Sequence, residues 1–240
     1  MVQVTDVTVY YEKNEKNQKS EPAEPALSGV SFSLGAGGRL ALMGANGAGK
    51  STLLLTLIGV LLPATGEITV AGIPVRPSRL RDLRQQAGMV FQNPDDQLFM
   101  PTVAEDVGFG LRNYGVAEAE ARARVDRTLS RLGIGHLKHR FSHRLSGGEK
   151  RLAALAGVLV MEPSFLLLDE PSSFLDPKAR RTLTAVLAGL PQAMLLATHD
   201  TDTARALCPD TLILKNGRVF ACGHTADILT DAALLAEAGL

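Results

Sequence analysis

The chain has 240 residues, which is long enough for one large domain or two small ones with a sizeable core. Its 25 lysines and arginines balance its 25 aspartates and glutamates, so the sequence offers no net positive charge for binding nucleic acid. The two cysteines, Cys208 and Cys222, match no metal-ligand spacing and indicate no disulfide framework, as expected in a reducing, cytoplasmic setting.

The sequence carries neither a membrane-spanning segment nor a secretion signal. Its longest apolar run, residues 53–62, is interrupted by Thr56 and Gly59 and is far shorter than the roughly 20 residues that cross a bilayer. The N-terminus lacks a basic leader and a cleavage site. We therefore expect a soluble chain, which can still dock on a membrane protein.

The first segment of the chain alternates apolar and polar residues. Valines recur through residues 2–9 with a break in the alternation, as in an edge strand or a hairpin. Residues 12–25 are almost wholly polar or proline, and we interpret them as a solvated, mobile loop. Strand alternation resumes over residues 30–34, and residues 39–43 form a predicted buried strand.

A glycine-rich loop follows this buried strand and precedes an apolar, helix-compatible run, as the phosphate-binding pattern G-x-x-x-x-G-K-[ST] requires. The loop consists of Gly44, Ala45, Asn46, Gly47, Ala48, Gly49, Lys50, Ser51 and Thr52. Its glycines let successive backbone N–H groups turn inward on an anion at the positive end of a helix. Lys50 would reach the β- and γ-phosphates, and the Ser51 hydroxyl would ligate Mg²⁺. A turn that binds nothing is the alternative, but every fixed position of the pattern is filled.

The rest of the chain alternates strands with helices. The predicted elements are a hairpin over 67–75, a short strand over 88–91, a mainly helical stretch over about 95–161, strands over 165–168 and 193–198, a helix over 177–187, a hairpin around residues 216–217 and short C-terminal helices. Such alternation implies an α/β fold with a mainly parallel sheet and its ligand at the strands' carboxyl ends. We expect one domain over 1–240 with a helical insertion.

Two adjacent carboxylates, Asp169 and Glu170, directly follow the predicted strand over 165–168. Beside a phosphate loop, Asp169 suits the Mg²⁺ ligand sphere and Glu170 suits a base that polarises water, because phosphoryl transfer depends on positioning and charge stabilisation. The alternative is a strand end followed by an ordinary helix cap.

A second glycine-containing segment opens the apolar helix predicted over 151–161. It consists of Ser146, Gly147, Gly148 and Glu149, and it offers backbone donors and a positive dipole end to an anion. Ser146 and Glu149 also have the spacing of a capping box, and both interpretations can hold together. One monomer that binds one nucleotide does not need a second helix N-terminus suited to phosphate. The Ser146–Glu149 segment would have a use if it contacted a nucleotide bound by a partner copy.

The full set of motifs resembles that of the ATP-binding-cassette (ABC) ATPases. The phosphate loop, Gln92 at a strand end, LSGGEKR, LLLLDEP and His199 after a later strand occur in the family's order and cover most of the chain. The resemblance implies a phosphate-loop core with an N-terminal antiparallel β subdomain and a helical subdomain inserted at about 95–160. It also implies a head-to-tail dimer that holds two ATP molecules with Mg²⁺, each between one copy's phosphate loop and the other's Ser146–Glu149.

The resemblance assigns a role to each remaining motif residue. Gln92 would contact Mg²⁺ and the attacking water, His199 would bond the γ-phosphate, and Glu170 would act as the base. Asp176 would cross the dimer interface, and Phe174 stands where the family usually has glycine. An aromatic residue near the N-terminus would stack on adenine; we favour Tyr11, which is in register with the preceding valines, over Tyr10.

A narrower resemblance lies in residues 90–99 and 105–110, which look like the ATPases of energy-coupling-factor importers, above all the cobalt/nickel type. Those ATPases use the region after the glutamine to grip a transmembrane coupling protein. Leu98, Phe99 and Met100 would form the contact patch, although a buried turn is an equally good interpretation of the first two.

We therefore expect a membrane-associated ATPase, as a homodimer or as a heterodimer with a close relative, that drives cobalt or nickel uptake through a transmembrane coupling protein and a substrate-binding membrane subunit. Importers of another micronutrient, such as biotin or another vitamin, are the first alternative. A non-transport ABC ATPase and a nucleotide-binding module without turnover are the others. The short neutral chain argues against nucleic-acid partners, and the filled positions Glu170 and His199 argue against a module without turnover.

Overall fold

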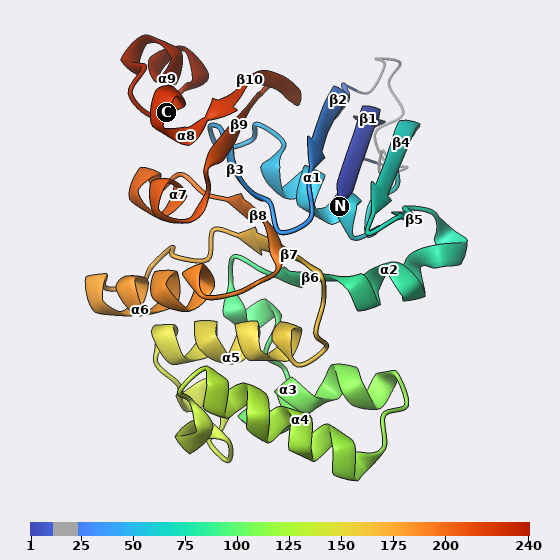
Figure 1. Cartoon of the computed structure of the whole chain (residues 1–240), viewed down its shortest axis with the longest axis vertical. Helices are drawn as coiled ribbons and strands as arrows, with labels where there is room; N and C mark the ends of the chain where they lie inside the picture. Colours follow the sequence, from blue (N-terminus) through green and yellow to red (C-terminus); the bar gives the residue numbers. More distant parts are fainter. Residues whose placement is uncertain (12–23) are drawn as a thin grey trace, which may run out of the picture.

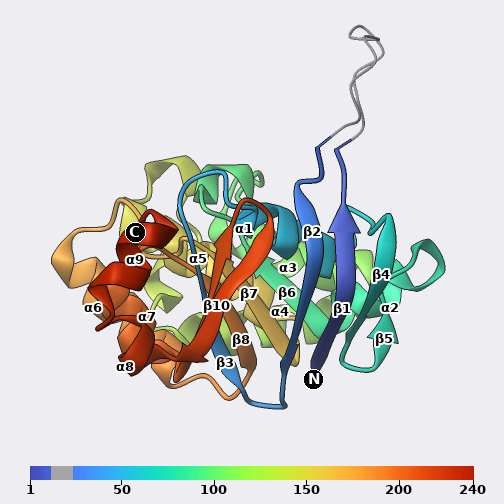
Figure 2. The same ribbon diagram turned by 90° about the horizontal axis from the view of Figure 1, so that it is seen from above.

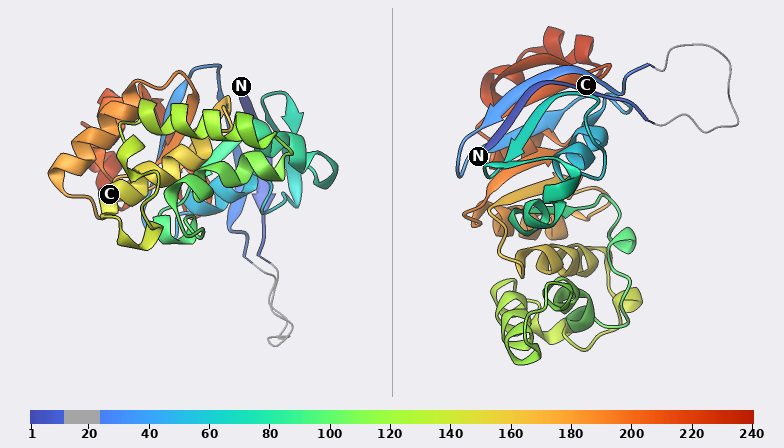
Figure 3. Two further views of the ribbon diagram at one scale, coloured as in Figure 1. Left: turned by 90° about the horizontal axis from the view of Figure 1, so that it is seen from below. Right: turned by 90° about the vertical axis from the view of Figure 1, so that its right-hand side faces the viewer.

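The computed structural model describes residues 1–11 and 24–240 (Figure 1). The predicted polar loop over 12–25 therefore lies almost wholly outside the described residues. The described chain forms two sheets with helices around them. Helices α3 (Val103–Asn113) and α4 (Glu118–Arg131) stand apart from both sheets, beyond α5 (Gly147–Leu159) (Figures 1 and 3).

The N-terminal sheet is antiparallel and has the strand order β2-β1-β4-β5. Its strands are β1 (Val2–Val9), β2 (Leu27–Leu34), β4 (Thr65–Val70) and β5 (Ile73–Pro74). The first strand is thus an inner strand, so the expectation of an edge strand was wrong. Its antiparallel pairing with β2, the next strand in the sequence, agrees with the alternative expectation of a hairpin. A register shift between Val4 and Val7 lets both valines face the core although they are three residues apart, and Asp6 between them has a φ of 49°. This bulge explains the broken alternation.

The second sheet has the strand order β10-β9-β3-β8-β7-β6 and is parallel except for β10. Figure 1 shows the strands in this order, and Figure 2 shows the N-terminal strands to one side of them. Its strands are β3 (Arg39–Met43), β6 (Ala87–Val90), β7 (Phe165–Asp169), β8 (Ala193–Ala197), β9 (Asp210–Lys215) and β10 (Arg218–His224). The antiparallel pair β9–β10 turns at Asn216-Gly217, as the sequence predicted.

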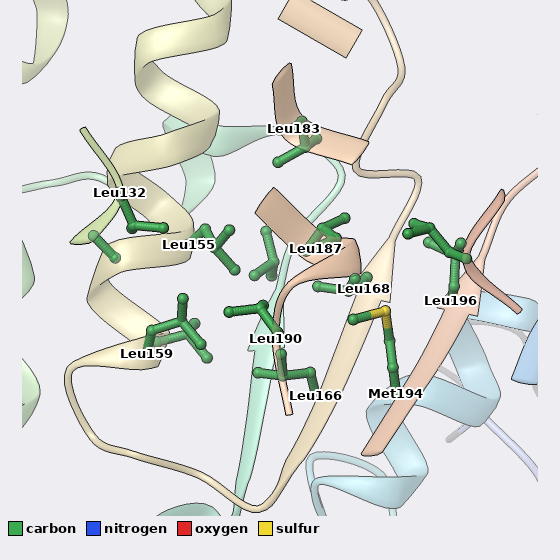
Figure 4. Packing of buried hydrophobic residues seen from close by; sticks show 14 of the residues in the cluster. Leu132, Leu155, Leu159, Leu166, Leu168, Leu183, Leu187, Leu190, Met194 and Leu196 are labelled. Atoms are coloured by element: carbon green, nitrogen blue, oxygen red, sulfur yellow. The ribbon is translucent and has the colours of Figure 1, made fainter. Parts of the chain in front are cut away.

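Strand β7 is buried over its whole length because both faces of the parallel sheet are covered. Leu166 and Leu168 point into a core formed with the helices on one side, and Figure 4 shows them near Leu155 and Leu187. Phe165 and Leu167 point into a second core, which also contains residues of α1 (Lys50–Leu57) and of the N-terminal sheet. This two-sided burial explains why the strand has an uninterrupted apolar sequence.

The helices confirm most of the predicted pattern. They are α1 (Lys50–Leu57), α2 (Leu80–Gln86), α3 (Val103–Asn113), α4 (Glu118–Arg131), α5 (Gly147–Leu159), α6 (Pro177–Ala188), α7 (Thr201–Leu207), α8 (Thr225–Ile228) and α9 (Ala232–Ala238). Helix α6 has Asp176 as its N-cap, as predicted, whereas α5 begins four residues earlier than the expected residue 151 because Ser146 caps it. Among the described residues, no helix is long and apolar enough to span a membrane.

Candidate functional site: the cavity at the carboxyl ends of the parallel strands

A cavity of about 1220 Å³ opens where the chain leaves β3, β7 and β8. It gathers most of the predicted site residues, which come from segments far apart in the sequence. Those that line it are Tyr11, Gly44, Ala45, Asn46, Gly47, Gly49, Lys50, Ser51, Thr52, Gln92, Asp169, Glu170 and His199. Of the predicted phosphate loop, only Ala48 is absent from this lining.

The loop backbone needs glycine at two positions. Gly44 has a φ of 144°, and a Cβ there would lie 2.3 Å from the Leu214 carbonyl oxygen. Gly49 has a φ of 104°, and its Cβ would lie 3.0 Å from the Ala26 carbonyl oxygen. A side chain at either position would therefore meet backbone in a conformation that L-residues rarely adopt.

The charged end of the loop is held by its own backbone. Lys50 is 9% exposed, and its Nζ donates hydrogen bonds to the carbonyl oxygens of Gly44 (2.7 Å) and Ala45 (3.1 Å). Ser51 Oγ donates to Asp169 Oδ2 over 2.9 Å, which joins the start of α1 to the end of β7. A hydroxyl and a carboxylate oxygen are hard ligands of the kind that Mg²⁺ accepts, so the donor set fits this ion.

Burial raises the pKa of Asp169 above its ordinary value, and the neighbouring negative charge of Glu170 adds to the rise. The hydrogen bond from Ser51 and the charges of Lys50 and Arg151 act in the opposite direction. A cation beside Asp169 would stabilise the charged form of this buried carboxyl group.

Glu170 and His199 form a pair across the carboxyl ends of β7 and β8. His199 Nδ1 lies 2.9 Å from Glu170 Oε2, and the Thr198 and Ser173 hydroxyls donate to the same oxygen over 3.5 and 3.3 Å. Glu170 is 7% exposed and has a φ of 45°, an unusual conformation that turns it out of the strand direction. The arrangement suits a carboxylate held in position to accept a proton.

Tyr11 is the N-terminal aromatic residue that lines the cavity, and its hydroxyl lies 2.9 Å from Thr52 Oγ1. Tyr10 is not among the lining residues. Adenine stacking by Tyr11 remains a prediction, now with the side chain beside the end of the phosphate loop.

Two predicted motifs lie outside this cavity. Ser146 and Glu149 form a complete capping box: Glu149 Oε2 accepts from Ser146 N over 2.8 Å, and Ser146 Oγ accepts from Glu149 N over 3.4 Å. Asp176 accepts from the backbone N–H groups of Lys178 and Ala179 at 2.8 and 2.9 Å, and these bonds lower its pKa. Neither the Ser146–Glu149 segment nor Asp176 lines the cavity.

The sequence analysis missed one residue that joins three parts of the site. Arg151 is 3% exposed and donates to the carbonyl oxygens of Phe91 (2.8 Å) and Ser173 (3.4 Å). It thereby connects α5 to the residue before Gln92 and to the loop after Glu170. Its place in the motif LSGGEKR was a signal, because a charged residue inside an otherwise apolar helix needs buried partners. The lining by Leu235, Gly239 and Leu240 near the end of the chain had no such signal.

A glycine-rich strand-to-helix loop, with two carboxylates at the end of a neighbouring parallel strand, defines a phosphate-loop nucleotide-binding protein. The pattern of the ABC transporter family matches residues 27–173. The chain is 51% identical over 209 residues to an ABC transporter ATP-binding protein of Streptomyces coelicolor, covering 87% of this chain and 80% of the relative. The chain therefore belongs to the ABC transporter family and is an ATP-hydrolysing, ATP-binding domain.

Two further relatives carry more specific names. The chain is 46% identical to the cobalt import ATP-binding protein CbiO of Rhodobacter capsulatus, over 89% of this chain and 78% of the relative. It is 42% identical to the energy-coupling factor transporter ATP-binding protein EcfA of Methanoculleus marisnigri, over 89% of this chain and 79% of the relative.

Solved structures give the same result for the fold. CbiO1 of Clostridium perfringens, part of a cbiONQ transporter complex, superposes with a TM-score of 0.83 at 36% identity, covering 98% of this chain and 93% of CbiO1. A dimeric ATP-binding cassette in a post-hydrolysis state with ADP and Pi gives 0.82 at 26% identity, covering 94% of this chain and 99% of the cassette. The expected ABC ATPase fold is thus confirmed.

We predict that Lys50→Ala abolishes nucleotide binding, because it removes the buried ammonium from the loop that would hold the phosphates. Fluorescence titration with a labelled ATP measures the loss. Lys138→Ala, which removes a lysine paired with Asp126 on the surface, is the matched control and should bind normally. Retained binding in Lys50→Ala would contradict the assignment of the phosphate site.

Proposed function

We propose that the chain hydrolyses ATP at sites shared between two copies, acting as one ATPase domain with a helical insertion at about 95–160. One observation carries this proposal. The Ser146–Glu149 segment begins a helix whose N-terminal backbone N–H groups can bind an anion, but it lies outside the cavity that the phosphate loop lines. A second copy can supply this segment. The dimeric cassette with ADP and Pi supports such an arrangement.

The predicted catalytic and metal-binding side chains in the cavity then each have a chemical role. Lys50 and the loop backbone would hold the β- and γ-phosphates, and Ser51, Asp169 and Gln92 would hold Mg²⁺, which neutralises phosphate charge when bound. Glu170 would accept the proton of the attacking water, while its contact with His199 fixes the orientation of both side chains. His199 would donate to the γ-phosphate from an exposed position at the rim.

We further propose that this ATPase is peripheral to the membrane and powers an energy-coupling-factor importer of cobalt or nickel. The names of the CbiO and EcfA relatives support this function, and so does the sequence of residues 90–99 and 105–110. Import of biotin or another vitamin is the alternative, because no described residue identifies the cargo.

The docking surface for a transmembrane coupling protein would differ from the expected patch. Leu98 packs against the core, whereas Phe99 is 63% exposed and makes an edge-to-face pair with Phe109, with ring centroids 4.8 Å apart. Asp95, three residues before Leu98, forms an ion pair with Lys150 over 2.6 Å, so its charge is balanced. We therefore place the apolar contact on Phe99 and Phe109, two exposed aromatic rings on the helical insertion.

Replacing the proposed base tests the enzyme mechanism. Glu170→Gln should keep the hydrogen-bonding shape but lose the proton acceptor, lowering steady-state turnover by roughly 10²–10⁴-fold while nucleotide binding persists. Phosphate release measures the rate, and Glu120→Gln on the surface of α4 is the control. Unchanged turnover in Glu170→Gln would rule out this base.

Replacing Ser146 tests the shared site. Ser146→Arg should spare ATP binding by the monomer and stop hydrolysis, because the new side chain blocks the segment that faces the partner's nucleotide. Losing the cap costs about 0.5–2 kcal/mol, so thermal unfolding is measured in parallel. Ser78→Arg, at an exposed position in the turn that precedes α2, is the control. Normal hydrolysis by folded Ser146→Arg would show that the site is not shared.

Uptake measurements test the transport role. A strain that lacks this chain should lose uptake of radioactive cobalt or nickel, and restoring the wild-type chain but not Glu170→Gln should recover it. The chain should also co-purify with a multi-spanning membrane protein. Normal metal uptake with lost vitamin uptake would favour the alternative cargo, and no transport defect would contradict the importer function.

A further inference from the structure

Phe174 is the most exposed large hydrophobic side chain among the described residues. It is 94% exposed, and it lines the same cavity as Gln92, Glu170 and His199. Covering a solvent-exposed aromatic ring with another surface is favourable, because it removes apolar area from water. Within the described residues, almost none of the Phe174 side chain is covered in this way.

The backbone at Phe174 is strained. Its φ is 63°, in the left-handed region that suits glycine and is unusual for a bulky side chain. Strain of this kind persists only where the surrounding structure enforces it, and it points to a function at the site.

The residues on either side hold Phe174 outward. Leu175 packs into the core formed with the helices, and Ser172 is buried, with its hydroxyl 3.5 Å from Asp200 Oδ2. Arg151 donates to the Ser173 carbonyl oxygen over 3.4 Å. With both neighbours fixed, the ring cannot turn into the fold without breaking these contacts.

We propose that Phe174 packs on a second copy of this chain and sets the affinity of the pair. This inference rests on the shared-site proposal, and it adds a contact that the nucleotide does not provide. The ring projects beside a cavity that lacks the Ser146–Glu149 segment, so a copy that supplies this segment must approach the same rim. Equal numbers of positive and negative residues also leave no net charge to oppose the pairing.

The proposal separates pairing from the stability of the monomer. Phe174→Gly removes the ring and relieves the left-handed strain, so the monomer should unfold at an unchanged or higher temperature. Pairing should nevertheless weaken, since full burial of a phenylalanine corresponds to roughly 10- to 100-fold in a dissociation constant. A generally damaged protein would lose both properties together.

The experiment measures the dimer dissociation constant by analytical ultracentrifugation with Mg²⁺ and ATP, in a Glu170→Gln background that slows hydrolysis. Phe174→Gly should raise the constant by at least about tenfold, and Phe174→Tyr, which keeps the ring, should stay near the parent. Ala71→Gly relieves a left-handed φ of 52° in the β4–β5 turn, and Leu62→Ala trims an exposed leucine; both lie outside the cavity lining and should pair like the parent.

The outcomes distinguish the two proposals. A parent chain that stays monomeric with ATP contradicts both the shared site and the role of Phe174. A parent that dimerises while Phe174→Gly pairs equally well overturns only the role of Phe174. If Phe174→Gly instead weakens ATP binding by the monomer and leaves pairing unchanged, the ring covers the nucleotide of its own chain and the proposal is wrong.

Discussion

The parallel pairing of β3, β8 and β7 is the constraint on which the site depends. Leu42 pairs with Ala197, and Asp169 pairs with the same residue from the other side, so the three strands end at one level. The phosphate loop, the two carboxylates and His199 therefore emerge together although they lie far apart in the sequence. The hydrogen bond between Ser51 and Asp169 closes this edge of the sheet.

The sequence was most informative where one local pattern determines one local structure. The phosphate loop, the Asn216-Gly217 turn and the Asp176 cap all lie where their residues predicted, since turns and caps depend on a few neighbouring groups. The inner position of β1 could not be predicted, because it depends on pairing with β4, about sixty residues later. The partners of Arg151 are two backbone carbonyl groups, which no residue type identifies.

The Ser146–Glu149 segment and the phosphate loop both form hydrogen bonds within the monomer, but through different groups. The backbone N–H groups of Ser146 and Glu149 already have side-chain partners in the capping box, yet the segment stands outside the cavity. In the phosphate loop, the ammonium group of Lys50 donates hydrogen bonds to two carbonyl oxygens of the loop itself. Each motif is thus structurally complete by itself, whereas the proposed chemistry requires both.

The support behind the phosphate loop makes nucleotide binding depend on a hairpin that is synthesised much later than the loop. Gly44 packs on the Leu214 carbonyl group, and Gly217 N donates to the Ala48 carbonyl oxygen over 3.1 Å. These contacts come from a hairpin made long after the loop itself, and a chain grows from its N-terminus. A ribosome-bound intermediate that lacks the β9–β10 hairpin would hold the whole loop sequence without the backbone that shapes it. A nascent chain would therefore bind ATP only after the β9–β10 hairpin has been made.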